Sequence, residues 1–280
     1  MSNISEQGII LRKIPIKESH LLISFLNTSG EKKSVLMLGG QGSKKKIKGT
    51  NFLELGQLIE YRCTKSKYSH GNSDLPQCRD WSLVWQHKHL RYDYVKFELF
   101  YYWISLIESI IPQSETVSNN DEVPSSIYLH VINALSYLDL ITLDLNNRNI
   151  VLARMQLFFL MRFAFLSGIA PLTKDCLACG LNFSIKESGD VYPALFLLHE
   201  GGFYCKACST DQRRKDDWIW FYWEWARTHN WKNMENLDDA ALWTHMGHGL
   251  EVVKNYITHH LNLSLQRLQI QDVSGFKNLP

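Results

Sequence analysis

The chain is constrained most by four cysteines that come in two pairs. Cys176 and Cys179 form one C-x-x-C pair, and Cys205 and Cys208 form the second. A gap of two residues lets both sulfurs of a pair turn toward one point, and four thiolates close a tetrahedral zinc site that has no open position. The pattern therefore predicts one structural Zn²⁺ bound by Cys176, Cys179, Cys205 and Cys208, and a role in architecture more than in catalysis.

Two other uses of these cysteines remain open, a pair of disulfides and a redox pair. The N-terminus lacks a basic and then apolar signal pattern, and Cys63 and Cys78 lie elsewhere in the chain. Both observations favour a reducing, cytoplasmic location over disulfides. A zinc deaminase needs H-x-E followed by P-C-x-x-C. Here His199 and Glu200 are adjacent and no proline precedes Cys205, so we reject that reading.

The residues around the cysteines predict a small module. Gly180 directly follows the first pair and suits a turn with positive φ. Strand-like segments at 181–185 and 194–199 flank the turn residues 187–190 and predict a hairpin between the pairs. Lys174 and Lys206 are placed to offset the charge of −2 that one Zn²⁺ and four thiolates would carry.

Charge is divided unevenly along the chain. Residues 1–80 contain 13 Lys and Arg against 7 Asp and Glu, whereas the other 200 residues contain 17 against 21. A basic first module on an acidic remainder predicts that an anionic polymer meets the N-terminal part. The plainer alternative is that the lysines only solubilise a strand-rich surface.

The first module reads as short strands separated by turns. Apolar or alternating runs occupy 8–14, 20–26, 33–38 and 52–63, and a basic loop lies at 43–49. This pattern predicts a small barrel of the OB-fold class, which binds single strands through cations and exposed aromatics. The residues that we expect to contact nucleic-acid phosphates are Arg12, Lys13, Lys17, Lys32, Lys33, Lys44, Lys45, Lys46 and Lys48.

The rest of the chain is mainly helical. Apolar residues recur at helical spacing over 97–111, 128–138, 151–166, 218–225 and 242–257, and Ser125 or Ser126 is a candidate N-cap. We assign these apolar faces to a shared core. We expect Trp220 and Trp223 to pack on the cysteine module, with a hydrophobic groove for a partner peptide as the alternative. Arg154 and Arg162 predict a solvated face, with an anion site as the lesser alternative. The histidine pairs 245/248 and 259/260 give little ground for a second metal site.

Taken in order, these segments resemble the bacterial recombination mediator family RecO over roughly residues 8–263. The resemblance lies in G-I-I-L-R-K-I-P-I-K-E-S-H-L-L-I-S-F-L-N-T-S-G at 8–30, F-L-E-L-G-Q-L-I-E-Y at 52–61 and A-R-M-Q-L-F-F-L-M-R-F-A-F-L-S-G-I-A-P at 153–171. It continues in C-L-A-C-G, G-G-F-Y-C-K-A-C and Y-I-T-H-H-L. The stretch 69–80 and the aromatic density of 218–231 depart from the family's pattern.

The resemblance implies an OB-fold followed by a helical domain with an inserted zinc module. It implies binding of single- and double-stranded DNA, annealing of complementary strands, and loading of RecA together with RecR. It also implies contact with the acidic C-terminal tail of single-stranded DNA-binding protein and a cytoplasmic, nucleoid-associated location. The sequence itself has no run of eighteen apolar residues, which predicts that no segment spans a membrane. We carry over no tail-binding residues.

Together these expectations describe an α+β multidomain protein that is not an enzyme, because no nucleophile–base pair or acidic metal cluster has a recognisable spacing. The rival hypothesis is a zinc-ribbon adaptor that binds RNA or a protein partner without annealing. The predicted ranges are 1–80 for the OB-fold, 81–173 and 211–270 for the helical domain, 174–210 for the zinc module and 271–280 for the tail.

Overall fold

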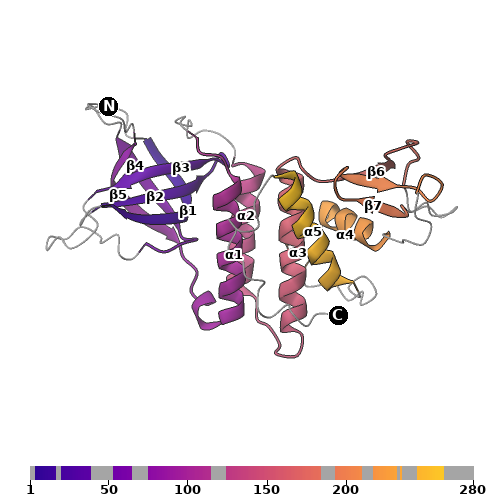
Figure 1. The fold of residues 1–280 in the computed structure, drawn as a ribbon. Coiled ribbons are helices and arrows are strands. Elements are labelled where there is room, and N and C mark those ends of the chain that lie inside the picture. Colours follow the sequence, from indigo (N-terminus) through magenta and orange to yellow (C-terminus); the bar gives the residue numbers. More distant parts are fainter. Residues whose placement is uncertain are drawn as a thin grey trace. The chain divides into compact units, whose positions relative to one another are not determined.

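A computed structural model of the chain describes residues 4–16, 20–38, 53–64, 75–114, 124–183, 193–209, 217–231, 234 and 245–261. The chain divides into two compact units, Met1–Ile141 and Thr142–Pro280. Figure 1 shows a barrel and two helices in the first unit, and helices with a small sheet in the second. This division places the first two helices with the barrel, whereas the predicted ranges separate them at residue 80.

Five strands close the barrel in the order β1-β2-β3-β5-β4, and β1 also pairs with β4. The β3–β5 pairing is parallel and the other pairings are antiparallel. This architecture confirms the predicted fold class of a small N-terminal β-barrel followed by helices, and its five strands are compatible with an OB-fold. The strands are β1 (Ile4–Ile16), β2 (His20–Asn27), β3 (Lys32–Met37), β4 (Leu58–Thr64) and β5 (Gln77–Trp85).

Strand β1 is long enough to pair with two neighbours. Its first part, residues 4–9, pairs with β4, and residues 8–16 pair with β2. The register shifts between Ile10 and Arg12. Such a bulge bends a strand and increases its twist, which is how a single strand serves both sides of a barrel.

The fifth strand was not among the predicted elements. Gln77–Trp85 lies partly in the stretch 69–80 that fitted no pattern, and a border at residue 80 would cut through β5. The strand completes the barrel by pairing in parallel with β3 at Leu36 and Met37.

The barrel interior contains a group of polar side chains beside its apolar core. Phe25 and Tyr61 stack with their ring centroids 4.6 Å apart. Next to them Glu6 accepts a hydrogen bond from the Tyr61 hydroxyl at 3.2 Å and pairs with the Lys33 ammonium at 3.1 Å. Burial, followed by the charge of Glu6, raises the pKa of Tyr61 well above its ordinary value, so the hydroxyl stays protonated and donates.

Two helices follow the barrel in the first unit, and both begin at a side-chain cap. A short 3₁₀ turn, η2 (Leu90–Tyr92), precedes α1 (Tyr94–Ile110), and the Asp93 carboxylate accepts the Lys96 N–H at 3.0 Å. Ser125 caps α2 (Ser126–Leu140) by accepting the Tyr128 N–H at 3.2 Å. The predicted N-cap is therefore confirmed, since Ser at this position satisfies an N–H that has no partner within the helix.

The second unit is built on α3 (Arg148–Leu166), which packs against both α4 (Asp217–Thr228) and α5 (Met246–His260). Among the described helices α3 is long and apolar enough to cross a membrane, but it is mostly buried inside the unit. A core helix passes the same test, and the burial of its aromatic residues against α4 and α5 fits that role.

A three-stranded sheet in the order β6-β8-β7 completes the second unit beside α4 (Figure 1). Its strands are β6 (Leu172–Cys176), β7 (Leu195–Leu197) and β8 (Gly202–Tyr204). The predicted strand at 194–199 corresponds to β7. In the predicted strand 181–185 the described residues contribute only an isolated bridge, from Asn182 to Asp175. The partner of β7 is β8 and not the 181–185 segment.

Candidate metal centre and nucleic-acid interface

The two cysteine pairs meet because they follow neighbouring parallel strands. Strand β6 ends at Cys176, and β8 ends one residue before Cys205. The two strands pair directly, with Cys176 opposite Phe203. Parallel neighbours end at the same edge of a sheet, so residues separated widely in the sequence converge there.

Each pair is shaped by a tight turn. The Gly180 N–H donates to the Cys176 carbonyl at 2.9 Å, with Gly180 at φ +71° as its position predicts. In the second pair the N–H groups of Cys208 and Ser209 donate to the Cys205 carbonyl at 3.1 and 2.9 Å. These turns fold both cysteines of a pair toward one side.

The backbone also favours thiolate at this site. Burial by itself raises the pKa of Cys176, but N–H groups of Cys205, Cys179 and Ala178 donate to its sulfur and together lower that pKa to about 6. The Cys205 N–H lies 3.3 Å from the Cys176 Sγ. In the metal-free set, sharing of protons with Cys179 and Cys205 raises the pKa of Cys208 to about 12. A bound metal ion would remove this difference between the pKa values of Cys176 and Cys208, because a metal ion binds cysteines as thiolates.

The four sulfurs fit a tetrahedral ion. They all lie within 4.8 Å of one another, and Cys179 Sγ is 3.7 Å from Cys205 Sγ. Sulfurs at about 2.3 Å from a tetrahedral zinc would be about 3.8 Å apart. The prediction that Cys176, Cys179, Cys205 and Cys208 form one cluster is confirmed, and the cluster could hold a metal ion. Among the described residues, these four cysteines are the cluster of potential metal ligands that the fold brings together.

Helix α4 holds the cysteine module through β6. The Trp220 indole N–H donates to the Thr173 carbonyl at 2.7 Å, and the Thr173 hydroxyl donates to the Glu224 carboxylate. The prediction that Trp220 packs on the module is thus confirmed. The same prediction for Trp223 was wrong, because Trp223 is fully buried against Phe165 of α3 and Tyr256 of α5.

Arginines and histidines outside the module have structural contacts. Arg162 donates to the carbonyls of Ala226 and Arg227 and so satisfies the C-terminal end of α4. Arg162 was predicted to lie on a solvated face of its helix, but it also bonds the end of α4. His245 and His248 both lie against the ring of Trp218.

Cys63 and Cys78, which the sequence left unassigned, are neighbours in the barrel. They are directly opposed across the antiparallel pair β4–β5, and their thiols share a hydrogen bond. Cys78 is buried and Cys63 is partly exposed. Side-chain contacts of this kind come from register, which the sequence alone does not give.

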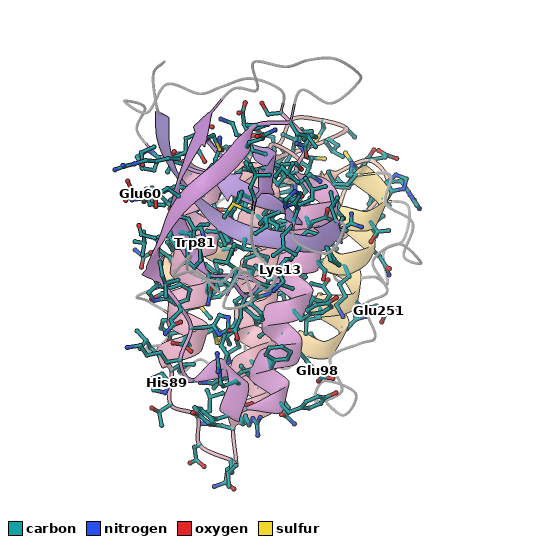
Figure 2. The ribbon with its side chains drawn as sticks, turned by 90° about the vertical axis from the view of Figure 1, so that its left-hand side faces the viewer. Lys13, Glu60, Trp81, His89, Glu98 and Glu251 are labelled. Carbon is teal, nitrogen blue, oxygen red and sulfur yellow. The ribbon has the colours of Figure 1, made fainter. Side chains whose placement is uncertain are left out.

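The predicted phosphate contacts fall into three groups. Arg12 and Lys13 are exposed on β1, where Arg12 lies 3.6 Å from Glu108 and Lys13 donates to the Leu53 carbonyl. Figure 2 labels Lys13. Lys32 is mostly buried and bonds the Glu108 carbonyl oxygen. Lys17, Lys44, Lys45, Lys46 and Lys48 lie outside the described residues, and their role stays a prediction.

Lys33 does not fit its predicted role. It is 7% exposed and its ammonium is paired with Glu6 inside the barrel. From sequence alone a lysine in a strand is expected to face solvent, because the buried carboxylate that neutralises it comes from another strand. We therefore withdraw Lys33 from the predicted DNA-contacting set.

The segment that joins β5 to α1 was not among the predicted sites. Here residues 86–92 and the turn at 54–57 border a cavity of about 390 Å³. The available signal was local, since basic and aromatic residues are concentrated in Q-H-K-H-L-R-Y between the barrel and the first helix. The cavity is lined by Glu54, Gln57, Gln86, His87, Lys88, Arg91 and Tyr92.

Comparison with known proteins gives one weak but extended similarity. No family model matches the chain. The chain is 24% identical over 210 residues to the DNA repair protein RecO of Desulfatibacillum aliphaticivorans, and the match covers 74% of this chain and 72% of that protein. The aligned region is long enough to include parts of both compact units. The chain is therefore similar, at low identity, to a RecO protein over most of its length.

Proposed function

We propose that the chain is a DNA-binding protein of recombinational repair that works as RecO proteins do. The observation that carries this proposal is the 24% identity to a DNA repair protein RecO over 74% of the chain. The closed barrel supports it, because barrels of this class bind nucleic acid strands. The finer activities that we propose are annealing of complementary strands and, with RecR, loading of RecA onto DNA coated by single-stranded DNA-binding protein.

The proposed mechanism needs no covalent chemistry, so we propose a mediator and not an enzyme. Cations on the barrel neutralise phosphates and lower the repulsion between two strands. Contacts that ignore sequence then let the strands slide into register. The proposed phosphate contacts are Arg12, Lys13, Lys17 and the lysines at 44, 45, 46 and 48. Lys32 is left out because its mostly buried ammonium bonds Glu108. The location that goes with this role is the cytoplasm, at the nucleoid.

We propose that the metal at the four cysteines is one structural Zn²⁺. Four thiolates are the ligand set that zinc prefers in closed sites, and no ligand position would remain for a substrate. The ion would join the edge of the β6–β8 sheet to both turns. Because Trp220 and Glu224 of α4 contact Thr173 of β6, the metal would also stabilise the docking of the module on α4.

An annealing assay tests the proposed activity. Two complementary fluorescent oligonucleotides coated with single-stranded DNA-binding protein are mixed with the wild type, with Lys44/Lys45/Lys46→Glu, and with Lys44/Lys45/Lys46→Arg as the charge-preserving control. We expect the wild type and the arginine variant to accelerate annealing and the folded glutamate variant to be slow. Each lost phosphate contact should also lower the salt slope of single-strand binding by roughly 0.7.

Failure of the wild type to anneal would contradict the mediator proposal. Binding of RNA or of a protein partner without annealing would instead favour the rival adaptor. Equal activity of the glutamate and arginine variants would show that the basic loop does not contact DNA.

A further inference from the structure

The segment between β5 and α1 is held in one shape by a buried carboxylate. Asp139 of α2 is 5% exposed and accepts the N–H groups of Lys88 at 3.1 Å, His89 at 2.7 Å and Leu90 at 3.0 Å. The Leu90 side chain is fully buried and also anchors the segment. The backbone is thereby pre-organised, which lowers the entropic cost of any contact that its side chains make.

The side chains of this segment that face solvent are cationic or aromatic. Lys88, His89 and Arg91 are exposed, and Tyr92 is 84% exposed. His89 is labelled near the lower end of the view in Figure 2. A tyrosine with so much of its ring in water is available for stacking. Exposed rings beside cations are the combination by which proteins bind single-stranded nucleic acid without regard to sequence.

The cations are free to contact a phosphate. Lys88 makes no ion pair within the part of the chain that the structure describes. Arg91 pairs with Glu54 at 2.9 Å, but both side chains are about half exposed, at 51% and 45%. An exposed pair contributes little, so Arg91 can exchange this carboxylate for a phosphate oxygen at small cost.

The cavity beside these side chains has room for a ligand. Its volume of about 390 Å³ is at the lower end of the range for small-molecule sites, about 300 to 1,000 Å³. Tyr92, Arg91 and Lys88 line it together with Gln57, Gln86 and His87, and the lining includes one acidic residue, Glu54, which is the partner of Arg91. One chemical neighbourhood therefore offers a ring, two cations and hydrogen-bonding groups.

His87 supplies a second indication of a ligand. It is 4% exposed, and its Nε2 lies 3.0 Å from the Leu55 carbonyl oxygen. A carbonyl only accepts, so Nε2 carries the proton, and in the neutral ring Nδ1 is left as an acceptor. That Nδ1 is buried and has no hydrogen-bond partner among the described residues. Buried polar atoms rarely stay unpaired. The Nδ1 is closed to solvent in this conformation, so an amino or imino N–H of a nucleobase would satisfy it only after the imidazole, which belongs to the cavity lining, turns toward the bound base.

We propose that this segment and its cavity bind a nucleobase and the adjoining phosphates of a single strand. Tyr92 stacks on the base, His87 accepts a hydrogen bond from its edge, and Lys88 and Arg91 contact the phosphates. The inference rests on the proposed DNA-binding function and deepens it by adding a base-stacking site that the lysines of the barrel do not provide. It also gives a role to Tyr92, whose ring is exposed directly after the segment that Asp139 holds.

The test uses a single-stranded oligonucleotide with one 2-aminopurine, whose fluorescence reports stacking. The full chain is compared with Tyr92→Ala, with Tyr92→Phe, which keeps the ring, and with Tyr101→Ala. Tyr101 is a matched control because it is 53% exposed on α1 and does not line the cavity. Circular dichroism confirms that each variant is folded.

We expect Tyr92→Ala to weaken single-strand binding about 5- to 100-fold and to abolish the fluorescence change. Tyr92→Phe and Tyr101→Ala should stay within about twofold of the wild type, since neither loses the stacking ring in the site. Duplex binding should fall much less than single-strand binding in Tyr92→Ala, because paired bases are already stacked. Lys88→Ala should lower the single-strand salt slope by about 0.7.

Two contrary outcomes are distinguishable. If the wild type binds single strands and Tyr92→Ala binds them equally well, the base-stacking site is refuted while the proposed function stands. If the wild type binds no DNA at all, the proposed function fails and this inference fails with it.

Discussion

Asp139 is the residue whose replacement should test most sharply how the β5–α1 segment is built. Its carboxylate accepts three backbone N–H groups, those of Lys88, His89 and Leu90, and it is nearly fully buried. Hydrogen bonds to a charged group are worth about 1.5 to 3 kcal/mol and neutral ones about 0.5 to 1.5 kcal/mol. Because the three bonds share one carboxylate, Asp139→Asn should lower the free energy of unfolding by about 3 kcal/mol.

Asp139→Ala should cost more, about 4 to 5 kcal/mol, because it leaves buried N–H donors without any acceptor. Thermal unfolding of the full chain measures both variants. At about 2 to 4 °C per kcal/mol for a protein of this size, Asp139→Asn should lower Tm by about 6 to 12 °C. Asp144→Asn is the control, since Asp144 is exposed and its carboxylate accepts one backbone N–H, that of Asn146.

Hydrogen exchange locates the effect. Peptides that span residues 86–92 should exchange about 100-fold faster in Asp139→Asn than in the wild type, because 3 kcal/mol corresponds to about two powers of ten. The variant should also bind single strands more weakly although Asp139 does not line the cavity. An unchanged Tm together with unchanged exchange over 86–92 would refute the claim that this carboxylate holds the segment.

Three further predictions follow from other contacts. Metal analysis of the purified protein should find one zinc per chain. Cys179→Ser should lose the metal and the cooperative unfolding of the cysteine module. Full zinc retention in that variant would contradict the four-thiolate site. Treatment with the thiol oxidant diamide should form a disulfide between Cys63 and Cys78. Opposed residues in an antiparallel pair have Cα atoms about 4.5 to 5.5 Å apart, which is within the range for a disulfide. Peptide mapping that finds both thiols free would refute this strand register. Gly56→Ala should lower the free energy of unfolding in urea by about 2 to 4 kcal/mol. Gly56 has φ +74°, and an added Cβ would collide with the ring of Phe100. A loss below about 1 kcal/mol would contradict this close approach of the Phe100 ring.

Local patterns were read correctly from the sequence where local chemistry decides the structure. The C-x-x-C turns depend on a few adjacent residues, so Cys176 and Cys205 could be assigned to one cluster before the strands that join them were known. Ser125 was a candidate cap because its effect lies within one helical turn. The pairing of β6 with β8 explains the cluster but has no local signature.

Features that depend on distant partners were missed. Lys33 is buried because Glu6, on a different strand, neutralises it. The strand β5 has the charged pair Arg79-Asp80 in its sequence and becomes a strand through pairing with β4 and β3. Strand preference depends on neighbours more than on the residues themselves, which is why such a segment fitted no pattern.

The central claim, that this chain binds single-stranded DNA mainly through its phosphates, is tested most directly by the salt dependence of binding. The affinity of the wild type for a fluorescent single-stranded oligonucleotide is measured by anisotropy from low to physiological salt. We expect the logarithm of the association constant to fall linearly with the logarithm of salt concentration, by about 0.7 for each phosphate contacted. Absence of binding at low salt, or binding that does not change with salt, would contradict the claim.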